Sequence, residues 1–179
     1  MPGRNHAAVL SSAIVELRQS VAWCTVSSAT TRVRWALRLT AAVALVQGLG
    51  HAAIFLSARP RHGAAEVAVI EAMRAQSFDF GGFAPHSYWD LYYGYGLLAV
   101  VFALFISLVL WLTSEFAEQP RQVRRFAGCI GAAVAVHAAI IARYFFRLPL
   151  EFDLAVLAGV LVSVVLAGRA PQATVERAL

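Results

Sequence analysis

Two histidines are the residues of this chain best suited to acid–base or ligand chemistry, His51 and His137. Histidine exchanges a proton near neutral pH and also binds metals. Both lie at similar depth in long runs without formal charge, where polar side chains are costly and should face one another or a cavity. Such a pair could clamp a haem iron from both sides. The alternative is that each is a neutral histidine hydrogen-bonded to a neighbouring helix.

Further polar residues stand at the ends of these runs. Asp90 could act as a general acid or base, but Ser87, three residues earlier, predicts a capping box at a helix start. For Glu151 and Asp153 the corresponding structural role is to complement the dipole at the start of a helix. Arg143 is expected to neutralise one of these acids.

Tyrosines and a tryptophan crowd residues 88–95 and predict an aromatic belt at the membrane surface. Gly94 and Gly96 would leave space beside the rings, so an aromatic-walled pocket is the alternative. The candidate ligand pocket therefore combines seven residues: His51, Asp90, Tyr92, Tyr95, His137, Arg143 and Tyr144. The sequence assigns none of them a catalytic role, and it predicts no metal site unless His51 and His137 bind haem.

Four uncharged runs would have to position these residues. The longest, residues 91–114, exceeds what a soluble core helix needs and matches a membrane span. With 60% hydrophobic residues and a mean hydropathy of +0.67, the chain is expected to form an all-α, four-helix transmembrane bundle. The spans are placed at about 37–58, 89–113, 125–145 and 149–168. Small residues at four-residue spacing, such as Gly159 and Ser163, predict close helix contacts.

The remaining segments are expected to flank or connect a membrane domain at 35–168. Residues 1–34 are interpreted as a loose cytoplasmic tail or surface helix, and 169–179 as a carboxyl-terminal tail. The outer loop at 59–88 should contain a short helix around 64–75, where apolar residues follow a helical period.

Arginine distribution predicts the orientation. All fifteen basic residues are arginines, and ten of them fall in the two termini and the connection between the second and third spans. Because cytoplasmic segments collect positive charge, both termini should be cytoplasmic, which places the polar candidates in the outer half of the bundle. Membrane orientation explains the net charge of +5, so no nucleic-acid partner is expected. Cys24 and Cys129 lack the spacing of a redox pair or zinc site.

The segment Ser-Tyr-Trp-Asp-Leu-Tyr-Tyr-Gly-Tyr-Gly at 87–96 is the most distinctive motif of the chain. Together with Gly-Leu-Gly-His at 48–51 and Arg-Tyr-Phe-Phe at 143–146, it resembles a family of short, uncharacterised bacterial four-span integral membrane proteins. The resemblance covers residues 35–168 and implies a multi-pass protein of the bacterial inner membrane, without an activity. Family members often have a histidine where this chain has Gln47.

Three functions remain open from the sequence, with the lipid bilayer as a partner in each. The first is a module that binds a small lipophilic molecule or lipid in the outer half of the bundle. Catalysis there, for example an isomerisation, would need an acid and a base beside one apolar cavity. The second is a haem- or quinone-linked redox protein. The third is an accessory subunit whose polar residues only join helices. The sequence specifies neither a cofactor nor an oligomeric state, and it lacks the continuous polar stripe of a channel.

Overall fold

The computed structural model describes residues 5–57, 60, 62–79 and 85–169, with side chains from residue 28 onward. Four of its helices are long and apolar enough to cross a membrane. They are α1 (Asn5–Ser57), α3 (Tyr88–Glu115), α4 (Pro120–Tyr144) and α5 (Arg147–Arg169), joined by the short helix α2 (Ala64–Ala75) and strands β1 (Ser77–Phe78) and β2 (His86–Ser87). The predicted all-α bundle is confirmed, and α2 has the predicted bounds.

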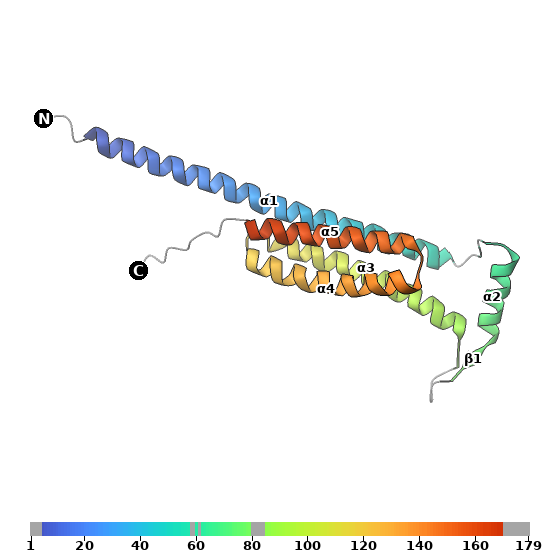
Figure 1. Ribbon diagram of the computed structural model, residues 1–179. Helices are drawn as coiled ribbons and strands as arrows, with labels where there is room; N and C mark the ends of the chain where they lie inside the picture. Colours follow the sequence, from blue (N-terminus) through green and yellow to red (C-terminus); the bar gives the residue numbers. More distant parts are fainter. Residues whose placement is uncertain (1–4, 58–59, 61, 80–84, 170–179) are drawn as a thin grey trace.

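Helix α1 differs most from expectation, because it begins at Asn5 and has 53 residues. Of the two alternatives for this segment, residues 5–34 are therefore helical and not a loose tail. Only residues from Ser28 onward belong to the apolar candidate span. No glycine or proline occurs between residues 5 and 47, so nothing in the sequence interrupts the helix. At 1.5 Å per residue α1 is about 80 Å long, and it extends well beyond the other helices (Figure 1).

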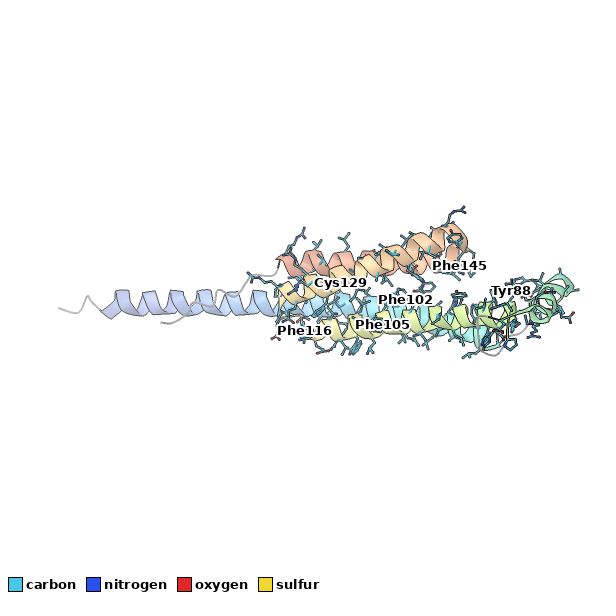
Figure 2. All side chains as sticks on the ribbon, turned by 90° about the horizontal axis from the view of Figure 1, so that it is seen from below. Tyr88, Phe102, Phe105, Phe116, Cys129 and Phe145 are labelled. Carbon is cyan, nitrogen blue, oxygen red and sulfur yellow. The ribbon has the colours of Figure 1, made fainter. Side chains whose placement is uncertain are left out.

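The four long helices form two layers. Helix α1 packs against α3 and α5, and α4 packs against α5, whereas α3 and α4 make few contacts with each other. Figure 2 shows the α4–α5 pair on one side of the α1–α3 pair. The buried core between the layers consists of small and branched apolar side chains, among them Leu37, Leu110 and Val134. The α3–α4 seam is thus the loosest side of the bundle.

Close approach of the helices depends on the small residues that the sequence singled out. A Cβ atom at Gly159 of α5 would overlap the side chain of Thr40 on α1. A Cβ at Gly131 would lie 3.2 Å from Val160, and one at Gly48 would lie 3.1 Å from Leu104. The predicted tight contacts are confirmed between α1 and α5, α4 and α5, and α1 and α3.

The end of the bundle that carries α2, here called the α2 end, is organised around the start of α3. Strands β1 and β2 pair antiparallel, with Ser77 opposite Ser87. Ser87 caps α3, since its hydroxyl accepts from the Asp90 amide while the Asp90 carboxylate accepts from the Ser87 amide, so the predicted capping box is confirmed. The guanidinium carbon of Arg74 on α2 lies 4.9 Å from the centre of the Trp89 ring. This cation–π contact joins α2 to α3.

Candidate functional site: a buried aspartate network

Asp153 is the most deeply buried acid in the described part of the chain, with 2% of its surface exposed. It is the seventh residue of α5, whose first turn contains no acidic residue. The expectation that Asp153 complements the start of this helix is therefore wrong. The residue belongs to the buried face of α5, which continues through Val156, Val160, Ser163 and Ala167.

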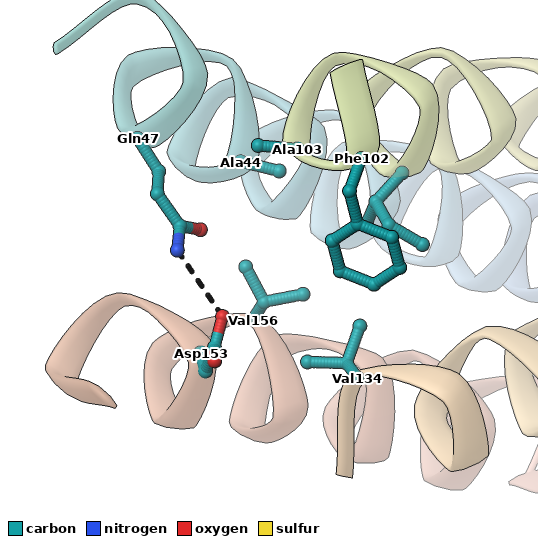
Figure 3. Close-up of a pocket in the computed structure, with 8 residues that line it drawn as sticks. Ala44, Gln47, Phe102, Ala103, Val134, Asp153 and Val156 are labelled. Atoms are coloured by element: carbon teal, nitrogen blue, oxygen red, sulfur yellow. Dashed lines mark hydrogen bonds between the residues drawn. The ribbon is translucent and has the colours of Figure 1, made fainter. Parts of the chain in front are cut away.

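Side chains from two other helices hold the Asp153 carboxylate. Nδ1 of His137 on α4 lies 2.8 Å from Oδ2, and Nε2 of Gln47 on α1 donates to Oδ1 over 3.1 Å. Figure 3 shows the Gln47 bond crossing from α1 to α5. Both carboxylate oxygens are thus satisfied, as a polar group inside an apolar bundle requires.

Phe102 adds the fourth helix to this network. Its ring stacks on the His137 imidazole, with centroids 4.5 Å apart and planes inclined by 27°. Phe102 comes from α3 and His137 from α4, so this stack bridges the loose seam between those two helices. The Asp153, His137, Gln47 and Phe102 side chains together form what is called here the aspartate network.

A small cavity of about 10 Å³ lies beside the network. This volume is at the lower limit of what one water molecule needs, about 10–15 Å³. Its lining is apolar apart from Gln47 and Asp153, and Phe102 points into it (Figure 3). Because pockets for small molecules measure roughly 300–1,000 Å³, a larger ligand reaches the network only if the helices around it move apart. Among the neighbouring long helices, α3 and α4 are the least closely packed pair.

The two histidines occupy different environments. His51 is half-buried on α1, one turn after Gln47, and stacks on Phe55 with centroids 4.7 Å apart. His137 stacks on Phe102 and contacts Asp153. Neither histidine lines the cavity beside the network, and haem binding stays a prediction of the sequence alone.

Gly96 serves packing at the start of α3. It is buried, and a Cβ atom there would overlap the ring of Phe55 on α1. The space beside Gly96 is thus filled by an aromatic ring and is not the open space that the pocket alternative would need there. At Gly94 a Cβ atom would meet no neighbouring atom within 4 Å, and nothing in the structure explains that glycine.

The other candidate residues face outward near the α2 end. Tyr92, Tyr95 and Tyr144 are 51%, 68% and 73% exposed, and Asp90 is engaged by Ser87. Arg143 lies over the Tyr144 ring, 5.4 Å from its centre. The structure therefore does not gather the seven candidates into one pocket, and of these seven only His137 belongs to the aspartate network.

The acids near the start of α5 are contacted by residues other than the predicted Arg143. Glu151 pairs with Arg147, one turn earlier on the same helix, at 2.7 Å. Asp153 pairs with His137. The expectation for Arg143 is wrong because α5 begins at Arg147, which brings a nearer arginine beside Glu151 and turns Asp153 into the bundle.

Gln47, Phe102 and Asp153 are network residues that the candidate pocket omitted. A sequence signal for Asp153 existed, because Val156, Val160 and Ser163 follow it at the three- and four-residue spacing of one helix face. For Gln47 the signal was its place beside the small residue Gly48, on the stripe that leads to His51. Phe102 carries no such signal, since the run around it is apolar throughout.

Comparison with known proteins assigns no relative to the chain: no family model, curated protein or solved structure matches it. Among the described residues, no three histidine, cysteine, aspartate or glutamate side chains gather closely enough to hold a metal ion. The chemistry that the site offers is that of one carboxylate and one imidazole in hydrogen-bonding contact, an acid–base pair set in an apolar bundle.

Proposed function

We propose that this chain is a multi-pass protein of the bacterial cytoplasmic membrane, with both termini in the cytoplasm, that binds a small lipophilic molecule or lipid at the aspartate network. With that orientation the α2 end faces outward and the network lies in the outer half of the bundle. The observation that carries the proposal is the Asp153 carboxylate, 2% exposed inside a bundle of membrane-spanning helices. Ionisable residues at such positions mark binding sites or proton pathways.

The stability of the folded protein does not by itself explain the presence of this polar network. A buried ionic or polar cluster can often be replaced by apolar residues of similar volume without loss of stability. The remainder of the interhelical core near it is formed by apolar residues such as Ala44, Ile106 and Val156. Apolar residues could form this helix contact equally well. The presence of a polar cluster there therefore supports a role in ligand binding.

The route to the network supports a lipophilic ligand. His137 and Phe102 meet where α3 and α4 make few contacts, and both helices expose large apolar residues such as Val101, Phe105 and Val136. A molecule dissolved in the bilayer can approach this seam sideways without crossing water.

A structural role is the second candidate, and one observation favours it. Both oxygens of Asp153 already have protein partners, from α4 and α1. The network could thus act only as a polar join between three helices, as interhelical hydrogen bonds do in other membrane proteins.

Native mass spectrometry of the protein in mild detergent separates the two candidates. The proposal expects a lipophile retained at near one per chain, and at least tenfold less of it in Asp153→Ala. Glu151→Ala, two residues away on the exposed face, is the matched control and should retain the ligand. Lipid-free wild-type protein that is fully folded would favour the structural role.

A further inference from the structure

The free nitrogen of His137 gives the proposed site a chemical preference. Nδ1 is engaged by Asp153, while Nε2 has no hydrogen-bond partner among the described residues. Among the described residues, the one fully buried side-chain nitrogen or oxygen without a partner is Arg34 Nε. His137 Nε2 also has no partner, so it is not fully buried. The His137 side chain keeps 23% of its surface exposed. Nε2 is therefore the network atom available to a ligand.

Charge balance determines whether Nε2 donates or accepts. A net charge inside an apolar membrane bundle is costly, so an overall neutral His137–Asp153 pair is favoured. With Oδ1 left unprotonated as the acceptor of the Gln47 bond, neutrality is reached in two ways. Either the carboxylate is ionised and the imidazole carries both protons, or the carboxyl is protonated at Oδ2 and donates to Nδ1.

Both neutral arrangements leave a proton on Nε2. In the ion pair the imidazolium has N–H groups at both nitrogens, and in the uncharged pair Nδ1 accepts, so the single imidazole proton sits on Nε2. Moving the shared proton between Oδ2 and Nδ1 does not change this. The bond from Gln47 to Oδ1 is compatible with either arrangement, since Oδ1 accepts in both.

We infer that the aspartate network selects lipophilic molecules bearing an acceptor oxygen, of which a carbonyl is the simplest, through a hydrogen bond donated by His137 Nε2. This inference rests on the proposed function and adds the class of ligand. A carbonyl oxygen within the bilayer core has no water to bind, so an N–H group at this depth offers it a partner that hydrocarbon does not.

The test uses two probes that share one carbon skeleton, octanophenone and octylbenzene, which differ by a carbonyl in place of a methylene. Wild-type protein should bind octanophenone roughly two- to tenfold more tightly than octylbenzene after correction for partition into detergent micelles, the range that one net hydrogen bond provides. The carbonyl stretch of bound octanophenone should also shift to lower wavenumber, as expected for a hydrogen-bonded carbonyl.

His137→Phe removes the N–H group while keeping an aromatic ring to stack on Phe102. This variant should bind both probes equally and lose the shift of the carbonyl stretch. His51→Phe is the matched control, because it removes the other membrane-embedded histidine, and it should retain both the preference and the shift.

The outcomes separate this inference from the proposed function. Equal binding of the two probes by wild-type protein, or a preference that survives in His137→Phe, would overturn the inference and leave lipophile binding standing. Failure of wild-type protein to bind either probe would count against both.

Discussion

His137 Nδ1 and Asp153 Oδ2 lie 2.8 Å apart although the two residues are sixteen positions apart in the sequence. Helices α4 and α5 run antiparallel, with only Phe145 and Phe146 between them. His137 stands seven residues before the end of α4 and Asp153 is the seventh residue of α5, so the short turn places them at matching heights. The hairpin itself thus assembles the acid–base pair.

Asp153→Ala should destabilise the protein by about 1–3 kcal/mol, because it leaves the His137 and Gln47 nitrogens without their acceptor inside the bundle. Unfolding in mixed micelles of mild detergent and dodecyl sulfate measures the change. Glu151→Ala should change stability by less than about 0.5 kcal/mol, since the Glu151 side chain is 51% exposed and its pair with Arg147 is a surface one. Equal effects of the two substitutions would show that the network is not stabilising.

Replacing the whole network tests whether its purpose is structural. The triple variant Gln47→Leu, His137→Phe, Asp153→Leu removes all three polar side chains of the network together, so that none is left without its partner, and keeps the side-chain volumes similar. Its stability should recover to within about 1 kcal/mol of wild type, as found for other buried ionic clusters, while its bound lipophile is lost. A triple variant that is less stable than Asp153→Ala would instead favour a structural network.

Gly159→Ala should cost about 1–3 kcal/mol in the same unfolding assay, the range for overpacking a tight contact. The added methyl group would overlap Thr40, which is 4% exposed and bonded to the Ala36 carbonyl. Gly128→Ala is the control, because a Cβ there meets no atom within 4 Å. It should be neutral or slightly stabilising through helix propensity. Similar destabilisation by both would mean that the α1–α5 contact is looser than described.

The architecture was predictable from the sequence, because long uncharged runs have few alternatives to membrane-spanning helices. The cap of α3 was predictable from residues 87–90 alone, because a capping box is a local arrangement that four consecutive residues complete. The polar residues before residue 28 left a loose tail and a surface helix both open, and the continuity of this segment with the first span was not predicted, although no helix breaker is present between residues 5 and 47.

The aspartate network could not be predicted in full because its contacts join distant parts of the chain. Asp153 seemed to lie at a helix start only because the beginning of α5 was placed two residues late, at 149 instead of Arg147. Gln47 meets Asp153 across 106 residues, and no local pattern encodes that distance. The candidate pocket included residues of the aromatic segment at 88–95, which are exposed near the membrane surface, whereas the buried polar contacts lie deeper in the bundle.

Cysteine labelling tests the proposed orientation. In a variant whose native Cys24 and Cys129 are replaced by alanine, Ser77→Cys should react with a membrane-impermeant maleimide in intact spheroplasts. Gln122→Cys, in the first turn of α4, should react only after the membrane is opened, because the arginines around it favour the cytoplasm. The reverse pattern would place the α2 end and the aspartate network on the cytoplasmic side.

Photocrosslinking with 4-octylbenzophenone tests most directly whether the aspartate network is a binding site. The probe is lipophilic, carries a carbonyl oxygen and inserts into nearby C–H bonds when irradiated, so peptide mapping of its adducts locates it. We expect adducts concentrated on α3 and α4 near Phe102 and His137, reduced at least fivefold in Asp153→Ala and unchanged in Glu151→Ala. Adducts spread evenly over the lipid-facing surfaces, with the same yield in Asp153→Ala, would contradict it.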